Sequence, residues 1–162
     1  KNETIKKAIE NIDLNADIFE RLSNVSDNMI IFNAGFILGS RANNLKVILA
    51  GGTQMASVLL TVNSILRSMD GVIDSSNLAL CTTKWINKDE KSNIKALLEQ
   101  LDFSINAYAS DFDFSLSSHP ALKLYDEGEA KEGVGCGGAL CYASINGLSK
   151  EDITKKIESF LG

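Results

Sequence analysis

The sequence predicts an α/β fold in which a parallel, Rossmann-like sheet is flanked by helices, in a single domain over residues 1–162. Three strand-length segments rich in apolar side chains, at 45–50, 78–82 and 103–109, alternate with segments of helical periodicity. This alternation is typical of parallel sheets that carry helices on both faces. Because ligands bind at the carboxyl ends of the strands in open α/β folds, we expect a site at that edge.

The composition is that of one soluble globular domain, since 44% of the residues are apolar and 23% are charged, both ordinary fractions. The net charge is −5 and the lysines and arginines form no cluster, which argues against nucleic acid as a partner. The apolar runs are far too short to cross a bilayer, so no membrane partner is expected. Neither a signal-peptide pattern nor a starting Met is present, and we expect an excerpt or a processed form of a cytoplasmic protein.

The cysteines and the histidine of the sequence do not indicate a metal site or a redox site. The thiols of Cys81, Cys136 and Cys141 have no C-x-x-C spacing, so we interpret them as small buried thiols in a reducing cytoplasm. His119 is the sole histidine and cannot join a histidine-rich cluster. We expect no metal site and no cofactor.

The helices are predicted from periodicity and capping residues. Polar, peripheral helices are expected at 4–12 and 17–25, and Ser26-Asp27 offers an N-cap for a strongly apolar helix that ends near residue 41. After the glycine turn that closes the first strand, Thr53 is expected to cap a long helix.

Towards the C-terminus, an amphipathic helix is predicted at 89–101, between the second and third strands. Pro120 suits the first turn of a helix over 121–126. A further helix is expected over 139–145, and Ser149 is expected to cap the last one.

The glycine-rich segment at 131–140 carries the strongest functional signal. Its G-x-G-x-x-G spacing matches the dinucleotide fingerprint by letter, but the apolar strand that must precede the fingerprint is missing. A Walker-type loop is also absent. Two interpretations remain, an anion-binding loop with bare backbone N–H groups and a tight helix–helix approach that needs small residues. Glu132, just before the glycines, is interpreted as part of an active site, with a solvated surface charge as the alternative.

Polar residues follow each predicted strand. The segment 51–54 is either a second phosphate cradle or a plain strand-to-helix turn, and 82–84 adds a lysine cation at the same edge. Asp111, Ser115 and His119 follow the third strand. His119 either contacts ligand or caps the next helix. The candidate substrate- and phosphate-binding residues are Gly51, Gly52, Thr53, Gln54, Thr82, Thr83, Lys84, Asp111, Ser115, His119, Gly133, Gly135, Gly137 and Gly138.

Taken together, Leu-Ala-Gly-Gly-Thr-Gln-Met at 49–55 and Lys-Glu-Gly-Val-Gly-Cys-Gly-Gly at 131–138 resemble an archaeal family related to nicotinate-nucleotide–dimethylbenzimidazole phosphoribosyltransferase. The bacterial enzymes carry a similar Glu-Gly-x-Gly-Ala segment near their C-terminus, where the glutamate serves as general base. The resemblance therefore implies that Glu132 is the catalytic base. It also implies that this chain is the C-terminal part of a longer, homodimeric enzyme.

The implied reaction transfers ribose 5-phosphate from nicotinate mononucleotide to a benzimidazole-type base for cobamide assembly. If the missing half completes the pocket, the isolated chain is expected to be inactive. Two alternatives stay open. One is a non-catalytic domain that binds a phosphorylated nucleotide. The other is an assembly module whose glycine faces, Gly35 with Gly39 and the segment 135–138, pack against another subunit.

Overall fold

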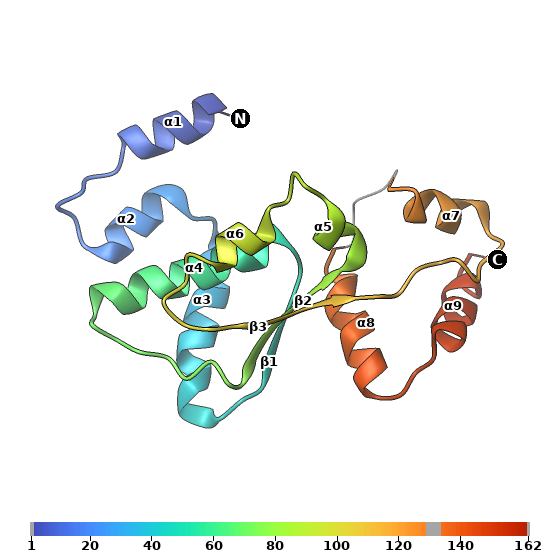
Figure 1. Ribbon diagram of the computed structural model, residues 1–162. Helices are drawn as coiled ribbons and strands as arrows, with labels where there is room; N and C mark the ends of the chain where they lie inside the picture. The colour runs from blue at the N-terminus through green and yellow to red at the C-terminus, as the bar shows by residue number, and fades with distance from the viewer. Residues whose placement is uncertain (1, 129–133, 162) are drawn as a thin grey trace.

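The computed structural model describes residues 2–128 and 134–161, so Glu132 and Gly133 lie outside the described residues. Three parallel strands, β1 (Val47–Ala50), β2 (Leu78–Thr83) and β3 (Asn106–Ser110), form a sheet in the order β1-β2-β3 (Figure 1). The crossover from β1 to β2 contains α4 (Thr53–Ser68). The predicted α/β fold with a parallel, Rossmann-like sheet is confirmed.

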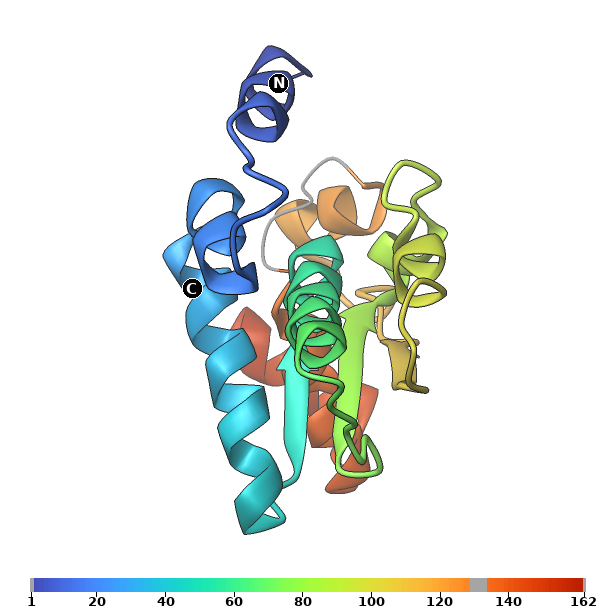
Figure 2. The ribbon, with the colours of Figure 1, turned by 90° about the vertical axis from the view of Figure 1, so that its left-hand side faces the viewer.

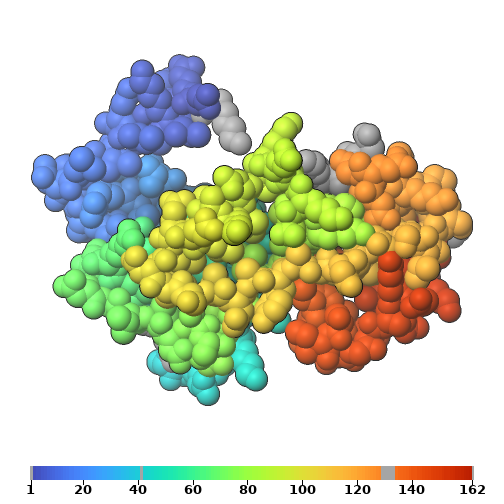
Figure 3. All heavy atoms as spheres, viewed as in Figure 1, coloured from blue at the N-terminus to red at the C-terminus, as the bar shows by residue number. Residues whose placement is uncertain are grey.

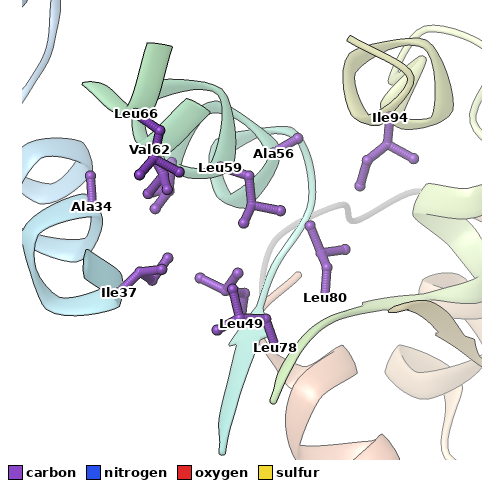
Figure 4. Packing of buried hydrophobic residues seen from close by; sticks show 11 residues of the cluster. Ala34, Ile37, Leu49, Ala56, Leu59, Val62, Leu66, Leu78, Leu80 and Ile94 are labelled. Carbon is purple, nitrogen blue, oxygen red and sulfur yellow. The ribbon is translucent and has the colours of Figure 1, made fainter. Parts of the chain in front are cut away.

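One face of the sheet is covered by α3 (Asn28–Ser40), α4 and α6 (Ile94–Leu98), with the short 3₁₀ turn η1 (Arg41–Asn43) leading from α3 towards β1. Figure 2 shows α3 and α4 on one side of the strands and α8 on the other. Leucines of β1 and β2 meet apolar side chains of these helices in the main core (Figure 4). Each buried leucine, isoleucine or valine contributes about 1.5–3 kcal/mol. The buried members are Ala34, Ile37, Leu49, Ala56, Val58, Leu59, Val62, Leu66, Leu78, Leu80 and Ile94.

The two N-terminal helices are peripheral, as the sequence predicts. No residue of α1 (Asn2–Glu10) is buried, and in Figure 1 this helix stands away from the sheet. The following helix, α2 (Ile18–Val25), is anchored through buried Leu22. Its first turn is fixed by Asp17, whose carboxylate accepts a hydrogen bond of 2.8 Å from the N–H of Phe19.

Directly after β2 comes the short helix α5 (Lys84–Lys88), and the described residues after β3 form α7 (Pro120–Asp126), α8 (Cys136–Ile145) and α9 (Lys150–Glu158). The second face of the sheet packs against α8, which contacts all three strands. A second apolar cluster joins this part and has three buried members, Phe112, Phe114 and Leu140.

Three predicted helix starts are confirmed in detail. The carboxylate of Asp27 accepts a hydrogen bond of 2.8 Å from the N–H of Ile30 at the start of α3. Ser149 accepts one of 3.1 Å from the N–H of Asp152 and caps α9. Pro120 occupies the first turn of α7. Each of these residues satisfies or removes an N–H that the helix itself cannot pair.

The predicted helix over 89–101 is wrong in extent, because only α6 at its centre is helical. The carboxylate of Asp89 accepts hydrogen bonds from the N–H of Lys91 and the hydroxyl of Ser92, both at 3.1 Å. Such local side-chain bonds compete with helix formation. Asn93, just before α6, has a left-handed backbone with φ of 41°.

Other elements also differ from the sequence prediction. The third strand starts later, at Asn106, because the apolar residues before it pack into the core. The prediction that Thr53 caps α4 is wrong, since Gly52 holds the N-cap position and no side chain caps it. The sequence does not predict α5. The helix α8 starts earlier than predicted, at Cys136, and so includes the glycines at 137–138.

The first turn of α8 lies so close to the sheet that two of its positions require glycine. A Cβ on Gly137 would lie 2.2 Å from the carbonyl carbon of Thr82, and one on Gly138 would lie 2.3 Å from the Cβ of Ala50. Both distances are far below van der Waals contact. The missing side chains therefore let α8 rest directly on β1 and β2.

Replacement of Gly137 by alanine should lower the free energy of unfolding by about 1–3 kcal/mol or more, because the added methyl group must push α8 away from β2. Chemical denaturation followed by circular dichroism measures this change. Gly35→Ala in α3 is the matched control, since its Cβ would meet no atom within 4 Å. That control should raise stability by about 0.5–1 kcal/mol. Equal stability of Gly137→Ala and wild type would contradict the close contact.

Candidate functional site

The two glycine segments of the sequence meet at the carboxyl ends of β1 and β2. A Cβ on Gly52, just after β1, would lie 3.2 Å from Cγ1 of Val134 and 3.3 Å from Cγ2 of Ile86. One on Gly135 would lie 3.6 Å from the carbonyl oxygen of Ala50. Segments more than 80 residues apart in the sequence therefore share one edge of the sheet.

The turn from β1 into α4 forms one side of this edge. Gly51 and Gly52 are buried, and the N–H of Gly51 donates to the carbonyl oxygen of Cys81 at 3.0 Å, which ties the turn to β2. Thr53 is half-buried and Gln54 is exposed. The first N–H groups of a helix have no carbonyl partner within it and lie at the positive end of its dipole. The turn therefore offers a place for an anionic group.

The glycines at the start of α8 have a structural role. The N–H of Gly137 donates to the carbonyl oxygen of Val134 at 3.1 Å, and that of Gly138 donates to Gly135 at 3.2 Å. Gly137 and Gly138 are buried, whereas Gly135 is exposed at the N-cap position. The packing contact that the sequence left open thus occurs at 137–138, although against strands and not against another helix.

The two threonines that end β2 are both buried. The hydroxyl of Thr83 accepts a hydrogen bond of 3.4 Å from the N–H of Ile86 and so caps α5. Among the described residues, Oγ1 of Thr82 is buried without a hydrogen-bond partner. Their side chains thus face the protein interior at the end of the strand.

Lys84, Asp113 and Lys150 form a partly buried ion cluster. Nζ of Lys84 donates to one carboxylate oxygen of Asp113 at 2.6 Å, and Nζ of Lys150 donates to the other. Lys150 also donates to the hydroxyl of Ser115 at 3.0 Å. Hydrogen bonds from Lys150 and then Lys84 hold the pKa of the Asp113 carboxyl well below its usual range. With two ammonium groups on one carboxylate, the cluster keeps an excess of positive charge.

A cavity of about 340 Å³ opens beside the meeting point of the two glycine segments. Its volume is near the lower end of the range of about 300–1,000 Å³ typical of small-molecule sites. The walls come from the end of β2, from α5 and α7 with the residues just after them, and from the segment before α8. They are Thr83, Trp85, Ile86, Lys88, Asp89, Tyr125, Asp126, Glu127, Gly128 and Val134.

A second cavity, of about 300 Å³, is almost entirely apolar and shares Trp85 and Tyr125 with the first. These two rings meet edge to face with centroids 4.7 Å apart, and the ring of Phe114 lies against both, with its centroid 6.2 Å from that of Trp85 and 5.8 Å from that of Tyr125. In the part of the chain that the structure describes, Nε1 of Trp85 and Oδ1 of Asp126 are buried without hydrogen-bond partners. Buried polar atoms normally have partners, so both atoms are candidates for a ligand contact.

The three polar residues predicted after β3 do not converge on one point. Asp111 is exposed and lines a separate hollow beside β3 and α8. Ser115 belongs to the ion cluster. His119 precedes α7 and donates its N–H to the hydroxyl of Ser117 at 3.0 Å, while its side chain does not cap the helix. Within the described residues, Nδ1 of His119 is buried and unpaired.

Trp85, Tyr125 and Asp126 line the cavities but are not among the site residues predicted from the sequence. The only local signal for Trp85 is its position directly after the polar end of β2. The other two belong to α7, and no local pattern shows that this helix packs beside α5. Asp113 and Lys150 were missed for the same reason, since their pairing joins segments 37 positions apart in the sequence.

Fold and site define the class of protein, an α/β domain with a candidate anion-binding edge at the carboxyl ends of parallel strands. The chain is similar to archaeal UPF0284 proteins. It is 36% identical to that of Aeropyrum pernix over 90% of this chain and 39% of the relative. It is 38% identical to the protein of Sulfolobus acidocaldarius, over 98% of this chain and 43% of the relative. It is 36% identical to the protein of Methanocaldococcus jannaschii, over 97% of this chain and 43% of the relative.

The chain therefore spans about two fifths of the length of these relatives, whose names state no activity. No family model matches the chain. Among the described residues, every helix is too short or too polar to cross a membrane. Across residues 2–128 and 134–161, no three His, Cys, Asp or Glu side chains gather as a potential metal site.

Asp113→Asn should lower the free energy of unfolding at pH 7. As the pH falls towards 2, the variant should lose less stability than the wild type. Because its folded-state pKa is lowered, the carboxylate stabilises the fold above the ordinary Asp pKa of about 3.9 and ceases to do so as the pH falls below it. Urea denaturation at pH values from about 7 to about 2 measures both effects. Lys150→Met should reproduce part of the change. If the free energy of unfolding of Asp113→Asn fell between about pH 7 and pH 2 as steeply as that of the wild type, a stabilising ion cluster would be contradicted.

Proposed function

We propose that residues 1–162 are part of a phosphoribosyltransferase that moves ribose 5-phosphate from nicotinate mononucleotide to a benzimidazole-type base. Nicotinate is released, and the product is an α-ribazole-type phosphate for the lower ligand of cobamides. The resemblance of the two glycine segments to the phosphoribosyltransferase family supports this assignment.

The observation that carries the proposal is the approach of Val134 to Gly52. It brings the described part of the second glycine segment to the N-terminus of α4, where an anionic phosphate would be stabilised. Glu132, the proposed base, is two residues before Val134 in the sequence. One segment would hold the phosphate and the other would supply the base.

The cavities beside this edge suit a nucleotide and an aromatic acceptor. The one lined by Val134 and Thr83 adjoins the proposed phosphate position. The apolar one, walled by Trp85 and Phe114, offers flat aromatic surfaces on which a bicyclic ring can pack. Nε1 of Trp85 is a buried donor that the described protein atoms leave unpaired, and a ring nitrogen of the acceptor could accept from it.

The chemistry needs only one carboxylate. In nicotinate mononucleotide the ring nitrogen is positively charged, so the leaving nicotinate departs with a neutral pyridine nitrogen and requires no general acid. The attacking benzimidazole must lose its N–H proton while its other nitrogen bonds to C1′ of the ribose. A glutamate placed beside that N–H can accept the proton, and attack on the opposite face converts the β-glycosidic bond to α.

Glu132→Gln in the full-length protein tests the proposal, because glutamine keeps the shape of the side chain but cannot accept the proton. The kcat for nicotinate release, measured by chromatography, should fall by about 10²–10⁴-fold while the KM for nicotinate mononucleotide changes little. Glu151→Gln, at an exposed position in the first turn of α9, is the control and should keep wild-type turnover.

If Glu132→Gln kept wild-type turnover, Glu132 would not be the general base. A wild-type protein that binds nicotinate mononucleotide but turns over no benzimidazole would favour a non-catalytic nucleotide-binding domain instead. The two results are distinguished by a binding titration run beside the activity assay.

A further inference from the structure

Among the described residues, no strand pairs with the outer edge of β3, which ends the sheet. Four of its five residues are exposed, and the side chain of Tyr108 is 56% exposed. Figure 3 shows the gold segment that holds β3 at the molecular surface. By contrast, five of the six residues of β2 are buried. Strands of parallel sheets are normally covered, so the exposure of β3 is unusual for this class of fold.

The edge also lacks the features that keep free strands from pairing. The sequence of β3, Asn-Ala-Tyr-Ala-Ser, contains no charge and no proline. A free edge usually carries lysine, proline or a bulge, because its unpaired N–H and C=O groups otherwise accept a further strand. The sequence of β3 therefore leaves its outer edge able to pair with a further strand.

The neighbouring face of the sheet is incompletely covered as well. A hollow of about 450 Å³ lies there, lined among others by Ile48, Ala79, Tyr108 and Ile145. The side chain of Ile145, at the end of α8, is 76% exposed and that of Tyr142 is 61% exposed. Yet α8 has no charged residue, a composition typical of a helix buried on all sides.

We propose that this surface, defined by β3 and the hollow beside it, is an intramolecular interface with the part of the full-length protein outside residues 1–162. That part adds a strand along the free edge of β3 and places an apolar element over Ile48, Tyr108 and Ile145. The similar archaeal proteins are long enough to supply it, since this chain matches 39–43% of their lengths.

Hydrogen exchange of the full-length protein, read by mass spectrometry on peptides that cover β3, tests the proposal. All β3 amides should exchange as slowly as those of β2, at least about tenfold slower than outward-facing amides of an edge strand. Fast exchange of every second β3 amide would overturn it. Protection lost on dilution, together with dissociation of a dimer, would assign the surface to a second copy of the chain and would equally overturn it.

Proline substitution gives a second readout. The N–H groups of adjacent strand residues point to opposite edges, so an edge strand tolerates proline at one of two neighbouring positions and an inner strand at neither. In the full-length protein, Ala107→Pro and Tyr108→Pro should both lower the Tm strongly, with Tyr108→Ala as control for the lost ring. Tolerance of proline at either position would show that the outer edge of β3 is unpaired.

Discussion

The architecture of the candidate site depends on the contact between the first turn of α8 and the sheet. With glycine at 137 and 138, the helix backbone lies where side chains would otherwise stand, against Thr82 and Ala50. This close approach places Val134, which precedes the helix, beside Gly52. A larger residue in that turn would separate the two glycine segments, and the shared edge would be lost.

The same contact distinguishes two uses of glycine within one short segment. Gly137 and Gly138 are buried and their amides are paired, so they fix the position of the helix. Gly135 is exposed at the start of the helix, next to the end of β1. In the assembly hypothesis, 135–138 packs against another subunit. Gly137 and Gly138 pack against strands of the same chain, so these two glycines are not free for a contact between subunits. Gly35 and Gly39 stay available for such a contact.

Local sequence predicts most of the fold but only part of the site. Apolar runs of strand length predict the strands, and Asp27, Pro120 and Ser149 predict helix starts, because these signals act over a few residues. The helix at 89–101 is overpredicted because the side chain of Asp89 competes for the backbone. The aromatic cavity and the pairing of Asp113 with Lys150 arise from long-range packing, which a single sequence does not encode locally. Glu132 lies outside the described residues, and its role stays a prediction.

The central claim is that the turn after β1 and the segment before α8 bind one substrate together. Amide chemical shifts of the full-length protein, followed during titration with nicotinate mononucleotide, test it most directly. We expect the amides of Thr53 and Gln54 and those around Gly135 to shift along one saturation curve with a single Kd. Shifts in only one of the two segments, or saturation with two different Kd values, would contradict it.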